Sequence, residues 1–167
     1  MTGIVVERFY VGAILENIVL IPMNDSRESM AALRQACSHA RHAPCRLCLL
    51  HVIEPKETGD LLGVATGASS YSMDKEDFFR AEARLEAWWK RVEDPGAPTD
   101  MVIRCGRVAE VIAEEAYRLH ATVIIMGAGK SVLDMVGRHP GTMCEKVKKL
   151  TGCGLVAVDE ERTYPLR

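Results

Sequence analysis

The residues most suggestive of chemistry lie in one glycine-rich stretch, MGAGKSVLDMVGRHPGT, which spans residues 126–142 and follows a run of aliphatic residues. Its Gly129-Lys130-Ser131 matches the end of a P-loop, G-x-x-x-x-G-K-[ST], in which successive backbone amides and the lysine bind phosphate groups. The first glycine of that motif would fall at Ile124, inside an expected strand where the chain cannot turn back. P-loops also usually follow the first strand of their sheet, whereas this stretch follows the fourth. The sequence therefore argues against a P-loop.

The same stretch has features of a different anion site. Gly127 and Gly129 would let backbone amides approach phosphate oxygens. Gly141-Thr142 opens an expected helix, whose free N–H groups and positive dipole end favour an anion. Pro140 precedes that glycine and removes one N–H donor. Two interpretations stay open: a phosphate-binding loop, and a glycine loop that serves only to turn the chain.

The six cysteines do not form a metal or redox motif. Cys45 and Cys48 make a C-x-x-C within an apolar, strand-like run, where side chains three residues apart point to opposite faces of a sheet. A redox C-x-x-C would instead be expected to open a helix, where the dipole lowers the thiol pKa. His39 and His42 are spaced for one helical face, but no further ligand group accompanies them. We expect reduced core thiols and no structural metal.

Hydrophobic periodicity predicts an alternation of strands and helices. Short, almost wholly apolar runs are typical of strands that are covered on both faces, and they occur at residues 17–23, 45–55, 99–106, 121–127 and 153–159. Stretches with apolar residues three and four apart predict helices at residues 25–43, 73–94, 107–120 and 141–152. This order predicts an α/β fold, a single doubly wound domain of the flavodoxin-like or Rossmann-like type with a five-stranded parallel sheet.

Several side chains have an expected place in these helices. Asp25 or Ser26 is available as the N-cap of the first helix. Trp88 and Trp89 cannot both face the core, because neighbours on a helix lie about 100° apart. In the last helix, the spacing points Met143, Val147 and Leu150 inward, with Gly152 as the C-cap.

Ligands of doubly wound sheets bind beyond the carboxyl ends of the strands, where the winding direction switches. The loops after the first strand, residues 23–26, and after the fourth, from Gly127 onward, would flank such a crevice. The formal net charge of −2 and the scattered Lys and Arg residues argue against a nucleic-acid partner. No apolar run is long enough to span a bilayer, so we expect no membrane association and a cytoplasmic protein.

Several motifs in this order resemble the universal stress protein family. IVLIPMNDSRES is similar to the family's opening strand with V-P-V-D-G-S, LCLLHVIEP to its second strand, and CGRVAEVIAEEA to its third helix. The glycine loop is similar to the family's G-x-x-G, nine residues, G-[ST]. The resemblance predicts an N-terminal extension or arm at residues 1–15, one domain at 16–160 and a tail at 161–167. It also implies a strand order of 3-2-1-4-5 and a homodimer that pairs through the last strand.

The resemblance further implies a site for ATP or another adenine nucleotide. Residues on the base and ribose side would be Pro22, Met23, Asn24 and Val52; residues on the phosphate side would be Met126, Gly127, Gly129, Lys130, Gly141, Thr142 and Met143. The chain departs from the family pattern, with one residue between the first two glycines instead of two, and eleven before the next instead of nine. Asn24 also replaces an acidic residue, and Asp25 replaces a glycine.

Three functions follow from these expectations. The first is a regulatory or stress-response protein that binds ATP, ADP or AMP, with Mg²⁺ if ATP is bound. The second is a dimeric interaction module of the same family that binds no nucleotide. The third is a small α/β enzyme that acts on a phosphorylated substrate. No nucleophile with a base and no placed pair of carboxylates is visible, so we expect no catalysis beyond slow ATP hydrolysis.

Overall fold

The computed structural model of the chain describes residues 17–55, 74–129, 142–159 and 163–166. The expected arm at 1–15, most of the connection between residues 55 and 73, Lys130 and Gly141 therefore lie outside the described residues.

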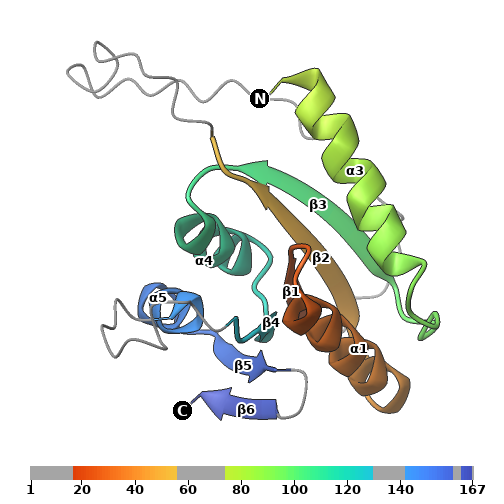
Figure 1. Cartoon of the computed structure of the whole chain (residues 1–167). Helices are drawn as coiled ribbons and strands as arrows, with labels where there is room; N and C mark the ends of the chain where they lie inside the picture. Colours follow the sequence, from red (N-terminus) through yellow and green to blue (C-terminus); the bar gives the residue numbers. More distant parts are fainter. Residues whose placement is uncertain (1–16, 56–73, 130–141, 160–162, 167) are drawn as a thin grey trace.

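A parallel sheet forms the centre of the molecule (Figure 1). Its five parallel strands have the order β3-β2-β1-β4-β5, and β6 adds an antiparallel strand beside β5. The strands are β1 (Ile18–Met23), β2 (Arg46–Ile53), β3 (Thr99–Cys105), β4 (Val123–Gly127), β5 (Gly154–Val158) and β6 (Thr163–Leu166). The helices are α1 (Arg27–His42), α3 (Lys75–Trp89), α4 (Val108–Arg118) and α5 (Met143–Leu150). The doubly wound flavodoxin-like fold expected from the sequence is confirmed.

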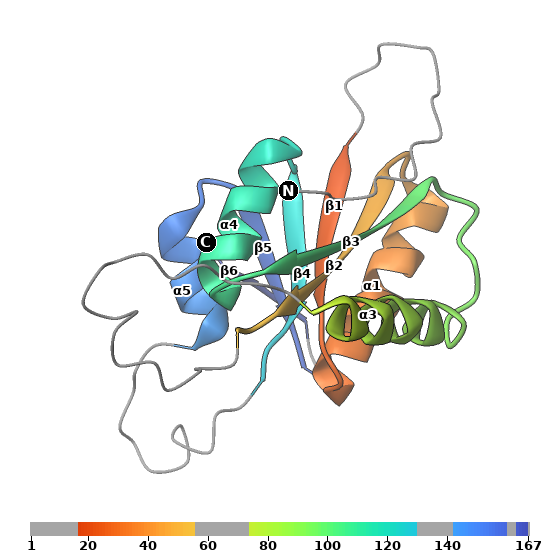
Figure 2. The ribbon, with the colours of Figure 1, turned by 90° about the horizontal axis from the view of Figure 1, so that it is seen from above.

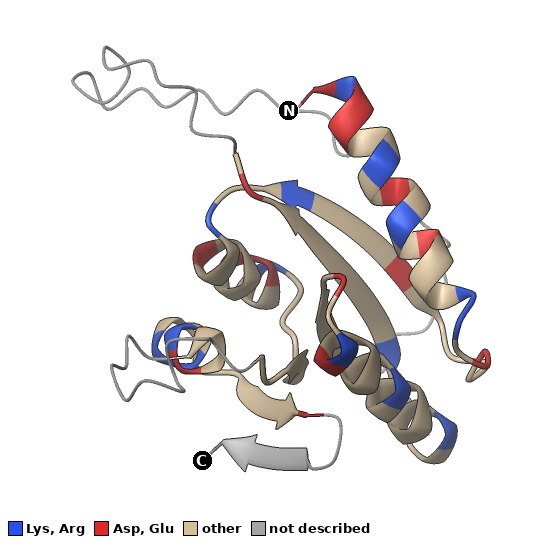
Figure 3. Cartoon of the chain, viewed as in Figure 1, with Lys and Arg blue, Asp and Glu red and all other residues tan. Residues whose placement is uncertain are grey.

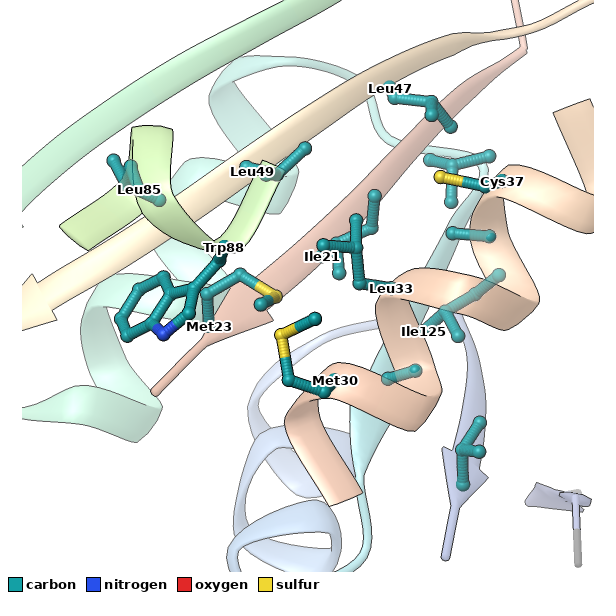
Figure 4. Close-up of a cluster of buried hydrophobic side chains, with 14 residues drawn as sticks. Ile21, Met23, Met30, Leu33, Cys37, Leu47, Leu49, Leu85, Trp88 and Ile125 are labelled. Atoms are coloured by element: carbon teal, nitrogen blue, oxygen red, sulfur yellow. The ribbon is translucent and has the colours of Figure 1, made fainter. Parts of the chain in front are cut away.

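Helices cover both faces of the sheet, and each face has its own core (Figure 2). Alternate residues of β1 contribute to the two cores, because successive strand residues point to opposite faces. Ile21 packs with Leu33 of α1 and Leu85 of α3 in the first core (Figure 4). Leu20 packs with residues of α4 and α5 in the second, such as Ile112 and Val147. Strands that are buried on both faces explain why their sequences are almost wholly apolar.

The cysteines follow the predicted geometry. Cys45 packs against the first core, whereas Cys48 is buried in the second, so the two thiols lie on opposite faces of the sheet. All six thiols are free. Burial raises the pKa of Cys48 to about 12 and that of Cys144 to about 11, so both are protonated at neutral pH. Among the described residues, no group of three or more His, Cys, Asp or Glu side chains is placed to hold a metal ion.

The helix ends are partly as expected. Ser26 is the N-cap of α1, and its side chain accepts a hydrogen bond from the Ser29 N–H. Trp88 is buried, whereas Trp89 is half-buried and packs at the margin of the same core, as expected for neighbours on a helix. The helix that carries them, α3, ends at Trp89, five residues before the expected end.

The prediction for the buried face of α5 was right for Val147 and wrong for Met143 and Leu150. Met143 and Leu150 are exposed, and the buried side chains are Cys144 and Val147. Thr151, rather than Gly152, is the C-cap. A helix of only two turns buries a short row of residues, here Cys144 and Val147, which are three apart. In so short a helix, apolar residues at both ends do not indicate which side faces the core.

The outer edge of β5 is already paired within the chain. β6 runs antiparallel to it, with Leu155 opposite Leu166 and Val158 opposite Thr163. This strand falls in the segment that we expected to be a tail. The edge from which we expect pairing with a second copy is thus occupied by a strand of the same chain.

A buried ion cluster ties β3 to α4. The Glu115 carboxylate, whose side chain is 4% exposed, accepts a hydrogen bond from Arg104 Nε at 3.0 Å and also pairs with Arg118. Two guanidinium groups compensate the one buried charge.

None of the described helices combines the length and the apolar composition needed to cross a membrane.

Candidate functional site

The candidate site lies at the winding switch beside β1. β1 has six register pairs with β2, up to Met23 opposite His51, but only two with β4, which end at Leu20 opposite Ile124. Beyond Leu20 and Ile124, the carboxyl halves of β1 and β4 are therefore no longer paired with each other, although both strands continue toward the same edge of the sheet. A ligand crevice is expected at this point of a doubly wound sheet.

The loop between β1 and α1 fixes the side chain of Asn24. The Ser26 N–H donates to Asn24 Oδ1 at 2.9 Å, and the Asn24 N–H donates to Ser29 Oγ at 3.0 Å. Because the Asn24 oxygen accepts this bond, its side-chain NH₂ group is the part that can donate to a ligand. Asn24 is exposed, so this donor is accessible to an acceptor on a base or a ribose.

Two of the expected site residues are core residues. The side chains of Met23 and Met126 are each 4% exposed, the first in the α1–α3 core and the second in the α4–α5 core. Either residue would contact a ligand through its backbone. Pro22 and Val52 are half-buried at the ends of β1 and β2, and Val52 packs against the α4–α5 core.

The neighbouring His51 has a structural role. Its Nδ1 lies 3.0 Å from the Met23 carbonyl oxygen, so Nδ1 carries the proton and donates. Its ring meets Trp88 edge to face, with centroids 5.3 Å apart. These contacts join the ends of β1 and β2 to α3.

The two glycines after β4 differ in what surrounds them. A Cβ on Gly127 would lie 2.7 Å from the carbonyl carbon of Glu28 and from the backbone nitrogen of Ser29. A Cβ on Gly129 would meet no atom of the described residues within 4 Å. Gly127 is therefore required for the close approach of α1 to β4, whereas the described residues leave space beside Gly129.

The N-terminus of α5 holds a carboxylate of its own chain. Thr142 Oγ1 accepts from the Glu145 N–H at 3.3 Å, and Glu145 Oε2 accepts from the Thr142 N–H at 2.8 Å. This capping box uses two of the donors that a phosphate would need and places a negative charge beside them. Met143, 39% exposed, stands in the first turn. A phosphate can use the donors that remain, but it must be held close to the Glu145 charge.

The expected residues that the structure describes lie at the carboxyl ends of the strands and at the start of α5, and two polar residues that sequence reasoning missed lie beside them. Ser29 is buried and accepts from the Asn24 N–H, and no motif signalled it. Glu145 was readable, because T-x-x-E is the sequence pattern of a capping box. Lys130 and Gly141 cannot be placed relative to these groups, since they lie outside the described residues.

Solved structures of other proteins share this fold. The hypothetical protein MJ0577 superposes with a TM-score of 0.67 at 21% identity, covering 89% of this chain and 99% of the other. A universal stress protein in complex with cAMP gives 0.64 at 15% identity, covering 86% and 97%. The universal stress protein from Archaeoglobus fulgidus in complex with dAMP gives 0.59 at 17% identity, covering 87% and 99%. At these identities the likeness shows the fold.

The sequence itself gives the family. The model of the universal stress protein family matches residues 17–142, which is most of the chain. No curated protein matches the chain in sequence. The fold and the sequence match together define the class: the chain belongs to the universal stress protein family.

Proposed function

We propose that the chain is a regulatory or stress-response protein that binds an adenine nucleotide at the carboxyl ends of β1 and β4. The observation that carries the proposal is the end of shared register between these strands, with the exposed Asn24 amide on one side and the start of α5 on the other. The complexes of two structural neighbours with cAMP and dAMP support it. A cytoplasmic location is part of the proposal.

The proposed contacts follow the geometry of the strand ends. The Asn24 NH₂ group, the Pro22 and Met23 backbone and Val52 take the base and ribose. The backbone after Met126, at Gly127 and Gly129, takes the phosphate, together with Lys130, Gly141, Thr142 and Met143. The open space beside Gly129 and the first turn of α5 are the described features that fit a phosphate. A bound ATP would bring Mg²⁺ with it.

Replacing Glu145 by glutamine tests the position of the phosphate. Glutamine keeps the capping box, because Gln at this position can also accept from the N-cap N–H, but it removes the charge. One unit charge at about 4 Å in water is worth about 1 kcal/mol. We therefore expect Glu145→Gln to bind ATP and AMP about fivefold more tightly than the wild type, measured by isothermal titration calorimetry.

Glu114→Gln is the matched control, since Glu114 is exposed on α4 and its loss changes the net charge equally. Its affinity should equal that of the wild type. Asn24→Ala should weaken binding of every adenine nucleotide by removing the NH₂ donor. If Glu145→Gln and Glu114→Gln behave alike while Asn24→Ala still weakens binding, the phosphate does not lie at α5.

The second candidate function is a dimeric interaction module that binds no nucleotide. The capping box favours it, because Glu145 already occupies donors at the start of α5. Thermal unfolding with ATP, ADP, AMP and cAMP separates the two functions, since a ligand well above its Kd stabilises the folded state. No shift with any of the four, together with no nucleotide released from the purified protein, would favour the interaction module.

A further inference from the structure

A groove lined by three arginines lies between the first half of α1 and the turn that follows α3. It has a volume of about 320 Å³ and is lined by Asp25, Ser26, Arg27, Met30, Arg34 and Arg91. Met30, only 7% exposed, gives the groove an apolar floor. Figure 3 shows basic residues along α1 and at the end of α3.

The arginines recur at a fixed spacing. On α1 they stand seven residues apart at Arg27, Arg34 and Arg41, and around α3 the same spacing relates Arg84 and Arg91. A spacing of seven returns to almost the same side of a helix after two turns, so the arginines of α1 form a row along that helix. Arg27 and Arg34 of this row line the groove on one side, and Arg91, in the turn that follows α3, lines it on the other.

Carboxylates compensate part of this positive charge. Arg84 lies 3.7 Å from Asp25 at one end, and Arg41 lies 2.9 Å from Glu93 at the other. Within the part of the chain that the structure describes, Arg34 and Arg91 form no ion pair, and both are exposed. Like charges repel, so the fold gains nothing from the positive charge that Arg34 and Arg91 add. The chain as a whole is slightly acidic, at −2, which makes the local excess a distinct feature.

We propose that this groove binds an acidic peptide segment of a protein partner, with two carboxylates that flank an apolar residue. Residues seven apart on α1 are separated by about 10 Å along the helix axis. A peptide in the polyproline II conformation repeats every three residues and rises about 9 Å over that repeat, so carboxylates at i and i+3 match the α1 row. The apolar side chain between them rests on Met30, and Arg91 closes the opposite wall. Guanidinium groups bind carboxylates in a bidentate manner, which suits this role.

The test uses the full chain and a fluorescein-labelled peptide, GELSEG, followed by fluorescence anisotropy. Its control peptide, GQLSQG, has the same shape and no side-chain charge. We expect GELSEG to bind and GQLSQG not to bind, and the binding of GELSEG to weaken as the NaCl concentration rises. Arg34→Glu with Arg91→Glu should weaken binding about tenfold or more, because each change replaces attraction by repulsion.

Lys146→Glu with Lys149→Glu is the matched control, since both lysines are exposed on α5, on the other face of the sheet, and the net charge changes equally. It should bind GELSEG like the wild type. Equal binding of the two peptides, or equal loss in both double variants, would overturn the proposal. So would a tighter binding of sodium tripolyphosphate at the same arginines, which would identify a phosphate ligand instead. Thermal unfolding of each variant checks that the fold is retained.

Discussion

Replacing Gly127 by alanine is expected to destabilise the protein without any change in hydrogen-bonding or charged side chains. The new Cβ would lie 2.7 Å from two backbone atoms of α1, whereas carbon atoms pack best at about 3.5–4.0 Å. Backbone cannot rotate away, so the first turn of α1 must shift. Overpacking of this kind costs about 1–3 kcal/mol. The shift also strains the cap from Ser26 to Ser29, which is worth about 1 kcal/mol.

We therefore expect Gly127→Ala to lose about 2–4 kcal/mol of unfolding free energy, measured by urea denaturation. For a chain of this size, each kcal/mol lowers the Tm by about 2–4 °C. Gly129→Ala is the matched control, since its Cβ enters open space, and its stability should be unchanged or slightly raised. The reasoning fails if Gly127→Ala is as stable as Gly129→Ala. The control also carries information of its own: it should weaken nucleotide binding if the amide of Gly129 approaches a phosphate.

Three further predictions concern the ion cluster, the thiols and the sheet edge. Glu115→Ala should lose about 3 kcal/mol in urea denaturation, because it removes the carboxylate shared by Arg104 and Arg118, while its exposed neighbour variant Glu114→Ala should change little. Above pH 9 the stability should fall, since unfolded thiols ionise near their usual pKa of 9.0 while Cys48 and Cys144 stay protonated to about 12 and 11. The unfolded state then binds fewer protons than the folded state, which lowers the unfolding free energy by up to about 1.4 kcal/mol per pH unit for each thiol. The double variant Cys48→Ala with Cys144→Ala should lose less unfolding free energy per pH unit above pH 9. An equal loss in the wild type and the double variant would contradict the raised pKa of these two thiols. Removal of residues 160–167 should raise the fraction of dimer in sedimentation, because it frees the β5 edge, and a chain that stays monomeric would show that β5 does not self-associate.

The buried apolar runs were sufficient to predict a parallel sheet, and the resemblance to the family supplied the strand order 3-2-1-4-5, which the structure confirms. It was insufficient for β6. The run Thr163–Leu166 is short and contains Pro165, which cannot donate to a ladder and therefore argues against a strand in sequence reading. An edge strand tolerates such a residue, because one of its sides needs no partner. The strand β6 is therefore recognised only from its backbone pairing with β5, in which Pro165 lies opposite Val156.

The positions of the candidate site residues in the fold were predictable, but their contacts were not. Asn24 and Thr142 follow from their positions at a strand end and a helix start. That the Asn24 oxygen accepts from Ser26 does not follow, because spacing does not show which polar groups a loop pairs. The role of Gly127 also does not follow from the sequence, because close packing of a helix and close approach to a phosphate both require a residue without a Cβ.

The central position of β1 also has a consequence for the order in which the chain folds. β1 pairs with β2 after a connection that contains one helix, but its other neighbour, β4, lies about 100 residues further along the chain. Local pairings form at a lower entropic cost than distant ones, so the β1–β2–β3 half is expected to assemble first. In pulse-labelled hydrogen exchange, amides of β2 should gain protection before those of β4, and the reverse order would refute this. During synthesis, the nucleotide site that we propose at the ends of β1 and β4 would then form only when β4 inserts beside β1, so binding at that site would report that folding is nearly finished.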